Sequence, residues 1–281
     1  MYCSIVPHHV TALFKPYFNP TIESTGSIGV GLVVEPRVTV CSDGDILIGE
    51  YHVGSARRVA ETLGFRDKRI KIVTPLPVGV GYAVSAATAI AVSLALGSLR
   101  GYTVSRLLRL AHESEVLERT GLGDVLAISC GVGLAIRVNP GAPGVGLAEC
   151  TQIPSKLFIL SLIVKREYTG EFVKNYMARG LHEKAEPVIL KITESLNFHT
   201  FAEEVLRFNI ENRLIRDLIG ESGESHILKT PGLVTAYGKK GLLIVIVESD
   251  RVEDALIHLS KLNYNILYLK PSSGGPQVEV V

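Results

Sequence analysis

The chain has 281 residues, of which 47% are hydrophobic and 20% are charged, and its formal net charge is +1. This composition supports a buried core and excludes a disordered chain, and the length suits one large domain or two ordinary ones. The small net charge argues against a general nucleic-acid or membrane-surface binder, although an anionic small molecule needs only a local cluster of donors. We therefore expect no nucleic-acid partner and no membrane partner.

Four cysteines, Cys3, Cys41, Cys130 and Cys150, are spread along the chain. They form no CxxC pair and no Cys/His cluster, which argues against a zinc site. Their even number permits disulfides, but the N-terminal stretch MYCSIVPHHVTALF lacks a basic region followed by a long apolar run, so we expect no signal peptide. These features predict a cytoplasmic protein with reduced thiols.

The first third of the chain has the composition of β-strands. Residues 29–40 are rich in β-branched side chains, and residues 45–51 and 69–73 follow turn signals. Residues 85–99 are rich in alanine and leucine and predict a helix. Because segment 83–99 also contains several serines and a threonine, it suits a buried helix better than a membrane span.

A second helix is predicted over residues 103–119, where apolar side chains recur at helical spacing. The glycines at 121 and 123 interrupt this pattern. Residues 125–129 could add one or two helical turns before strand character returns at 131–138.

The stretch NPGAPGVG at 139–146 is the strongest interruption in the chain, and we place a domain boundary near it, between residues 1–150 and 151–281. Beyond it we expect a strand at 157–165, helices at 170–181, 183–196 and 201–218, strands at 233–237 and 242–248, a helix at 252–262 and a strand at 265–269. This order predicts an α+β fold whose second part is similar to a ferredoxin-like layer with extra helices.

The stretch PVGVGYAVSAA at 77–87 places two glycines directly before the first long helix. A helix N-terminus presents unpaired N–H groups and attracts phosphates, and glycines let the backbone approach them closely. Ser85 could cap the helix or contact a phosphate or its metal. An ordinary strand–helix turn is the alternative. There is no GxxxxGK[ST] loop, and Val84 stands where a dinucleotide fingerprint needs glycine.

A second cluster lies in AHESEVLERTGLGD at 111–124. His112 and Glu115 are three residues apart and share one helix face. Asp124 follows a glycine turn that could return it toward the same cleft. Because Val116 follows Glu115, the stretch is not an HExxH metal site. A solvated, charged helix surface is the alternative interpretation.

Residues 77–87 resemble the second motif of the GHMP kinases, PxxxGLGSSAA. The matching residues are Pro77, Gly79, Gly81, Ser85, Ala86 and Ala87, while Ala83 replaces the second glycine of GLG and Val84 replaces the first serine.

The chain is most similar to the archaeal pantoate kinase branch of that family. The resemblance is carried by residues 7–11 (PHHVT), 25–31 (TGSIGVG), 77–87, 111–125 and 131–137 (GVGLAIR), which cover most of the first 146 residues in order. Support from the second half is weaker, because residues 230–238 stand in place of the third motif with a degenerate glycine pattern.

This resemblance implies a GHMP kinase fold, with an N-terminal domain similar to domain 2 of ribosomal protein S5 and a ferredoxin-like C-terminal domain, assembled as a homodimer. It implies ATP-dependent phosphorylation of (R)-pantoate to (R)-4-phosphopantoate in coenzyme A biosynthesis, with Mg²⁺. The residues expected around ATP are Pro77, Gly79, Gly81, Tyr82, Ala83, Val84, Ser85 and Ala86.

The resemblance also implies roles for the acidic residues. Glu115 would hold Mg²⁺, with the Ser85 hydroxyl as a second oxygen ligand, because Mg²⁺ prefers hard oxygens and keeps several waters. Asp124 would orient the acceptor hydroxyl and accept its proton.

The remaining site residues would bind pantoate. Arg137 could pair with its carboxylate through two parallel hydrogen bonds. Ser27 and His112 would contact its oxygens, and His9 is expected to line the pocket. Turn formation, a surface position or a structural histidine are the alternatives for these residues.

Two other functions stay open. The same fold could phosphorylate another small alcohol, of the homoserine or mevalonate type. It could also bind a ligand without catalysis, although Ser85, Glu115 and Asp124 together argue against this, since a binding module has no need of a base beside a metal ligand.

Overall fold

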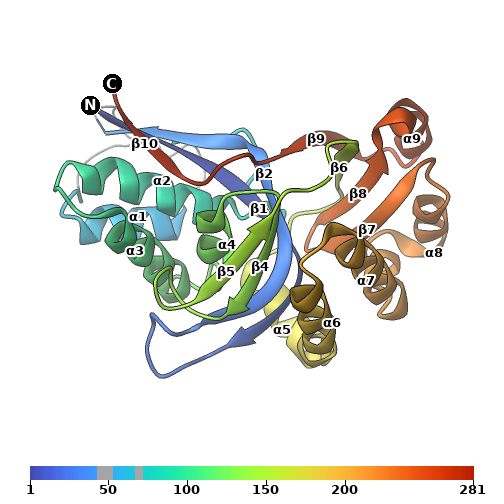
Figure 1. The fold of residues 1–281 in the computed structure, drawn as a ribbon, viewed down its shortest axis with the longest axis horizontal. Helices are drawn as coiled ribbons and strands as arrows, with labels where there is room; N and C mark the ends of the chain where they lie inside the picture. The colour runs from blue at the N-terminus through green and yellow to red at the C-terminus, as the bar shows by residue number, and fades with distance from the viewer. Residues whose placement is uncertain (43–52, 67–71) are drawn as a thin grey trace.

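The computed structural model describes residues 1–42, 53–66 and 72–281 (Figure 1). Two long antiparallel strands, β1 (Tyr2–Tyr17) and β2 (Gly26–Cys41), run through the first half of the molecule. Both are almost entirely buried, which explains their richness in valine. Shorter strands complete this sheet: β3 (Ile72–Val73) and β4 (Leu134–Asn139) pair with β2, β5 (Leu147–Thr151) pairs with β4, and β10 (Gln277–Val280) pairs with β1.

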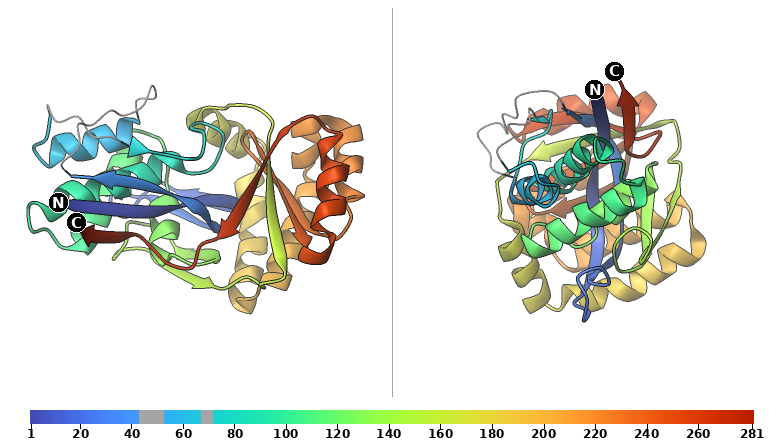
Figure 2. Two further views of the ribbon diagram at one scale, coloured as in Figure 1. Left: turned by 90° about the horizontal axis from the view of Figure 1, so that it is seen from above. Right: turned by 90° about the vertical axis from the view of Figure 1, so that its left-hand side faces the viewer.

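Four helices pack together beside this sheet (Figures 1 and 2). They are α1 (Gly54–Thr62), α2 (Val84–Ser98), α3 (Val104–Leu117) and α4 (Asp124–Cys130). Helix α2 is buried on nearly every side and is apolar all round, as expected for a helix surrounded by other elements. Within the described ranges, no helix is long and apolar enough to cross a membrane.

The second half is built on strands β6 (Leu157–Ile163), β7 (Leu233–Lys239), β8 (Leu242–Glu248) and β9 (Asn265–Pro271), in the order β9-β6-β8-β7. Strand β9 also pairs with β2 and joins the two sheets. The helices are α5 (Thr169–Ala178), α6 (Leu181–Ser195), α7 (Phe198–Glu211), α8 (Leu214–Leu228) and α9 (Val252–Ser260), with a 3₁₀ turn at Ser249–Arg251.

The β8 strand explains how this half is layered. Leu242, Ile244 and Ile246 face a core shared with α6, α7 and β1, whereas the alternate residues face a core with α8 and α9. Because both faces are buried, the strand is continuously apolar rather than alternating.

The α+β prediction is confirmed, and most predicted elements lie where expected. Helices predicted at 85–99 and 103–119 correspond to α2 and α3, and residues 125–129 lie within α4. The strand predicted at 45–51 lies outside the described residues, as do residues 69–71 of another.

One predicted helix is wrong. Residues 201–218 are divided between α7 and α8, because Arg213 adopts a left-handed conformation with a φ of 59° between them. The prediction named no strand at β1, although it assigned strand character to the first third of the chain, and it also missed α1 and the short strands β5 and β10.

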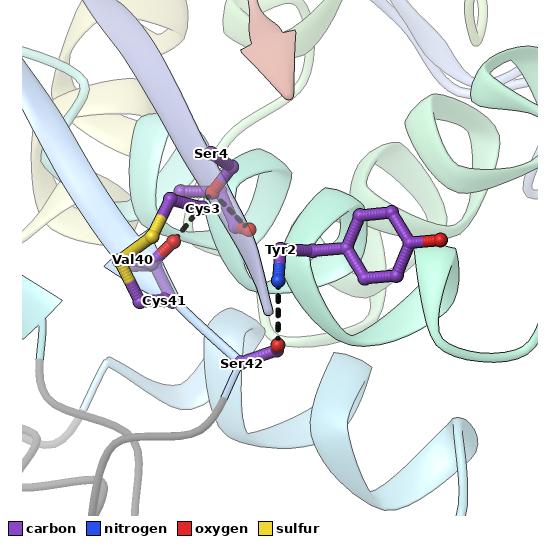
Figure 3. The surroundings of a disulfide bond; sticks show 7 residues. Tyr2, Cys3, Ser4, Val40, Cys41 and Ser42 are labelled. Atoms are coloured by element: carbon purple, nitrogen blue, oxygen red, sulfur yellow. Dashed lines mark hydrogen bonds between the residues drawn. A yellow bond between two sulfur atoms is a disulfide. The ribbon is translucent and has the colours of Figure 1, made fainter. Parts of the chain in front are cut away.

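The expectation of reduced thiols is also wrong in this structure, since Cys3 is bonded to Cys41 and Cys130 to Cys150. Figure 3 shows the first bond, where Cys3 and Cys41 are direct partners in the β1–β2 ladder. Next to it, the Ser4 hydroxyl donates to the Val40 carbonyl. The partners lie 38 and 20 residues apart in sequence, so their pairing depends on how the strands and helices meet.

Candidate active site

A cleft of about 790 Å³ lies between the two halves of the molecule. Its walls include the loop before α2, the loop between α3 and α4, residues of β1, β2 and β4, the start of α5 and the turn between β7 and β8. Of the site residues predicted from sequence, those that line it are Ser27, Gly79, Gly81, Tyr82, Ala83, Val84, Ser85, Asp124 and Arg137.

The loop before α2 has the backbone of an anion site. Gly79 and Gly81 have φ angles of 84° and 130°, which favour glycine, and Ala83 precedes the helix with a φ of 52°. No side chain caps this helix, so its first N–H groups stay open toward the cleft. The left-handed alanine costs about 1 kcal/mol, which the surrounding contacts must offset.

The second half of the chain holds this loop in place. The amide of Glu167 donates to the Gly79 carbonyl at 3.0 Å, and the amide of Gly241 donates to the Val80 carbonyl at 3.2 Å. The Tyr82 side chain is fully buried, and its hydroxyl is hydrogen-bonded to the Ser161 hydroxyl in β6. The loop carbonyls are therefore engaged away from the helix N-terminus.

Glu115 lies beside the helix start, as the sequence predicts. Its carboxylate accepts hydrogen bonds from Ser85 Oγ at 3.1 Å and from Thr120 Oγ1 at 2.6 Å. The residue is only 2% exposed, and this burial raises the pKa of Glu115 to about 7. Ser55 is a third hydroxyl neighbour, and no ion pair of Glu115 is found among the described residues, so the carboxylate and its hydroxyl neighbours offer the hard oxygen donors that suit Mg²⁺.

Asp124 is the first residue of α4 and lies close to Glu115. A Cβ added to Gly121 would lie 2.3 Å from Glu115 Oε2 and 3.5 Å from Asp124 Oδ2, so the two acids flank this glycine. Asp124 Oδ1 accepts hydrogen bonds from His9 Nδ1 at 2.7 Å and from Thr11 Oγ1 at 3.2 Å. Asp124 therefore lines the cleft, and Glu115 lies directly behind the cleft wall, beside Gly121 and Ser85.

Charge keeps Asp124 ionised. Burial alone would raise the pKa of Asp124, but the Lys239 ammonium, the hydrogen bond from His9 and the Arg137 guanidinium together hold it well below its usual range. His9 is fully buried, and this burial lowers its pKa to about 4, so the neutral ring donates Nδ1–H to the carboxylate. Asp124 is thus a charged acceptor at neutral pH.

Arg137 is a buried cation facing the cleft. It is only 1% exposed, and within the described ranges its Nε and Nη1 atoms have no hydrogen-bond partner. Gly123 allows it to approach, because a Cβ there would lie 2.8 Å from Arg137 Nε and 2.3 Å from Ser27 Oγ. Together these groups form a site with free donors for a planar anion such as a carboxylate.

His112 has a different environment. It is buried in α3, and its Nε2 atom donates to the Thr25 carbonyl at 2.9 Å, so it supports the turn that leads to Ser27. It does not line the cleft, and neither do Pro77, Ala86, Glu115 and His9, so the prediction that His9 lines the pocket is wrong. For the other residues, direct contact with a ligand stays a prediction.

Sequence reasoning missed the lysines of the β7–β8 turn. Lys239 and Lys240 line the cleft opposite Asp124, together with Thr11 and Glu167. The available signal was the stretch GKKG at 238–241, where two charges lie between two apolar strands.

Comparison with known proteins agrees with this geometry. Residues 50–132 match the GHMP kinases N terminal domain. The chain is 28% identical to a pantoate kinase of Thermococcus kodakarensis over 92% of both chains, and 24% identical to one of Methanocaldococcus jannaschii over 89% of this chain and 94% of that one.

Its fold matches a solved phosphotransferase related to the CoA biosynthesis pathway, with a TM-score of 0.79, 24% identity and 99% of each chain covered. The match spans both halves of the molecule and therefore includes the cleft between them. From the domain match, the full-length relatives and the shared fold, we conclude that the chain is a homologue of pantoate kinases, with the fold of GHMP kinases and, at residues 50–132, a match to their N-terminal domain.

Proposed function

We propose that the chain is an ATP-dependent kinase that converts (R)-pantoate to (R)-4-phosphopantoate in coenzyme A biosynthesis. One observation carries this proposal: an open helix N-terminus, Asp124 and a buried arginine with free donors line one cleft, and Glu115 lies directly behind its wall. The full-length likeness to pantoate kinases supports the choice of acceptor.

The nucleotide phosphates would lie on the loop before α2, because kinases of this family use ATP and this loop presents its amides to the cleft. Glu115 and Ser85 would hold Mg²⁺, which neutralises phosphate charge when bound. The raised pKa of Glu115 fits this role, since a divalent cation would favour the charged carboxylate.

The acceptor would be fixed at both ends. Arg137 and Ser27 would bind the pantoate carboxylate, and Asp124 would accept a hydrogen bond from the reacting hydroxyl. As the hydroxyl oxygen bonds to the γ-phosphorus, the bond to the ADP oxygen breaks and ADP leaves with that electron pair, while the hydroxyl proton passes to Asp124. His9 and Thr11 keep the Asp124 carboxylate oriented by donating hydrogen bonds to its Oδ1 atom.

The test is a coupled assay of ADP release with pantoate, pantothenate, homoserine and mevalonate, each with and without Mg²⁺. We expect release only with pantoate and Mg²⁺. Release with homoserine or mevalonate but not pantoate would assign another acceptor, and ATP binding without acceptor-dependent release would indicate a binding module. ADP release with pantothenate alone would show that the acceptor is pantothenate, the next compound of the same pathway, and not pantoate.

We further propose that the enzyme works as a cytoplasmic homodimer and that residues 1–150 and 151–281 are its two domains. The placement of β10 on the first sheet shows that the end of the chain returns to the N-terminal half. Light scattering of the purified protein would test the dimer, which a mass of one chain would contradict.

A further inference from the structure

The turn between β7 and β8 carries two lysines into the cleft. Lys239 is the last residue of β7 and is paired with Leu242, and Lys240 forms the turn with a φ of 55°. The turn contacts the loop before α2, because Gly241 donates to Val80 and the Lys239 carbonyl lies 3.1 Å from where a Cβ on Gly81 would be. Since the flanking β8 strand is buried on both faces, the fold fixes where these charges lie.

The two lysines differ in their partners. Lys240 Nζ donates to Thr169 Oγ1 at 2.8 Å. Burial lowers the pKa of Lys240, and the charges of Asp124, Glu167 and Glu115 oppose this shift. Lys239 makes no ion pair within the described part of the chain and no side-chain hydrogen bond is found for it there, although it is half-buried. Its ammonium is nevertheless the strongest charge acting on Asp124.

Among the described residues, four cations and three acids line the cleft: Arg119, Arg137, Lys239 and Lys240, and Glu118, Asp124 and Glu167. Lys239 and Arg137 both act on Asp124, and Lys240 interacts with Asp124 and, more weakly, with Glu167 and Glu115. Arg137 has Ser27 as its neighbour and suits one anion, the acceptor carboxylate. An ammonium near Asp124 without a partner of its own then faces the position where the phosphoryl group meets the acceptor hydroxyl.

We propose that Lys239 is a catalytic residue that contacts the phosphoryl group during its transfer from ATP to the acceptor oxygen. This inference rests on the proposed function. In the transfer, the γ-phosphorus forms a bond to the acceptor oxygen, the bond to the ADP oxygen breaks with its electron pair on ADP, and the proton goes to Asp124. Lys239 keeps its three protons throughout and stabilises the negative charge on the equatorial oxygens.

The charge state of Lys239 supports this role, and its dependence on pH can be measured independently. Burial lowers the pKa of Lys239 to about 8, the Asp124 carboxylate opposes this shift, and Lys240 and Arg137 add to it. The other titratable groups near this cluster are neutral His9, Glu115 and Glu167. The ammonium is therefore present at neutral pH and is lost as the pH rises through about 8 in the free enzyme.

The experiment compares Lys239→Met, Lys239→Arg and Lys240→Met with the unmodified enzyme. For Lys239→Met we expect kcat to fall by about 10²–10³-fold, the loss typical of one transition-state donor, with both KM values changed less than about threefold. Lys240→Met should instead raise the KM for ATP. Lys239→Arg should recover part of kcat and lose the fall of kcat/KM above about pH 8, since guanidinium stays protonated.

A second measurement separates this inference from the proposed function. Calorimetry would compare the binding of ADP alone with that of ADP and aluminium fluoride, a mimic of the transferring phosphoryl group, with Mg²⁺ present. We expect tighter binding with fluoride, and Lys239→Met should lose this gain while ADP alone binds as before.

The outcomes are distinct. An enzyme that phosphorylates none of the four alcohols, yet shows the fluoride gain and loses it in Lys239→Met, would contradict only the proposed function. A Lys239→Met enzyme with a kcat within threefold of the original, or with an unchanged fluoride gain, would overturn the role of Lys239. Absence of the gain in the unmodified protein would overturn it as well.

Discussion

Asp124 illustrates how single residues determine the chemistry of this cleft. Its low pKa makes it a weak base, so in the proposed reaction its main contribution would be to hold the acceptor hydroxyl in line with the phosphate, which is what a loose phosphoryl-transfer transition state needs. Two hydrogen bonds, from His9 and Thr11, leave its second oxygen for that hydroxyl.

We predict that Asp124→Asn lowers kcat by about 10²–10⁴-fold, because the amide keeps the shape but lacks the charge that holds the hydroxyl in line and cannot take its proton. Steady-state kinetics with pantoate would show the loss, and circular dichroism and the melting temperature would show that the variant is folded. Near-normal turnover in a folded Asp124→Asn enzyme would remove the residue from the mechanism.

Arg137 should determine acceptor binding rather than nucleotide binding. We predict that Arg137→Ala raises the KM for pantoate by about 10²-fold or more, as expected for a lost charge-assisted bidentate pair of about 3 kcal/mol, while the KM for ATP changes little. Arg137→Lys should recover only part of the affinity, because a lysine lacks the planar fork. Equal increases in both KM values would contradict this assignment.

The sequence predicted part of the site for identifiable reasons. Ser85, Glu115 and Asp124 lie in two short motifs, and the helix starts and glycine turns in those motifs fix their directions. Lys239 was missed because it reaches Asp124 only through the docking of a distant hairpin. Contacts of this kind depend on tertiary packing and leave no local pattern.

At the scale of elements, β1 combines a structural and a functional role. Its buried residues include His8 and His9, two titratable groups inside a strand that is otherwise mainly apolar. His8 Nδ1 donates to the Pro36 carbonyl at 2.6 Å, while burial lowers the pKa of His8, like that of His9, to about 4. Both rings are therefore neutral in the folded protein at neutral pH.

We predict that this strand makes the protein sensitive to acid. The folded histidines have pKa values near 4 and the unfolded ones about 6.5, so the unfolded state binds more protons and stability is lost as the pH falls from about 6.5 to about 4. Each histidine adds about 1.3 kcal/mol per pH unit to this slope near pH 5. Glu115 acts in the opposite direction, since burial raises its pKa in the folded state.

Urea unfolding of His8→Gln at pH 5, 6 and 7 would test this prediction. The unfolding free energy of the variant should fall less steeply with decreasing pH, by the contribution of one histidine, even if its stability at pH 7 is lower. His199→Gln is the matched control, because that side chain is 83% exposed and should keep the original slope. Parallel curves for all three proteins would show that His8 does not titrate as proposed.

The fold was predictable where an element has a recognisable pattern in its own sequence. Helices α2 and α3 follow from composition and helical periodicity, and β8 follows from its continuous apolar run. The division between α7 and α8 could not be predicted in this way, because Arg213 takes a left-handed conformation that residues other than glycine rarely adopt. The short strands β5 and β10 owe their existence to the partners they pair with.

At the scale of the whole molecule, the second half of the chain fixes the loop before α2 in the first half. Glu167, Gly241 and Ser161 hold the loop before α2, and β9 joins the two sheets. The disulfides lie in the first half but constrain different parts of it. Cys3–Cys41 joins the paired strands β1 and β2 near their ends, whereas Cys130–Cys150 fixes the end of the helix that begins with Asp124.

We predict that the two disulfides stabilise the protein to a similar degree but affect catalysis unequally. From sequence separations of 38 and 20 residues, the loop-entropy relation gives about 4 kcal/mol for Cys3–Cys41 and about 3 kcal/mol for Cys130–Cys150. Alkylation of the denatured, unreduced protein should find no free thiol. The Cys130→Ser/Cys150→Ser pair should also lower kcat, because α4 can then shift Asp124 relative to Lys239.

The Cys3→Ser/Cys41→Ser pair is the matched control, since it removes a bond of similar strength away from α4. It should lower the melting temperature by several degrees and leave kcat near its original value at a temperature where both variants are folded. Calorimetry and initial rates on the same preparations would separate the two effects. Four reactive thiols in the native preparation, or equal losses of kcat in both pairs, would show that the Cys130–Cys150 bond does not position Asp124.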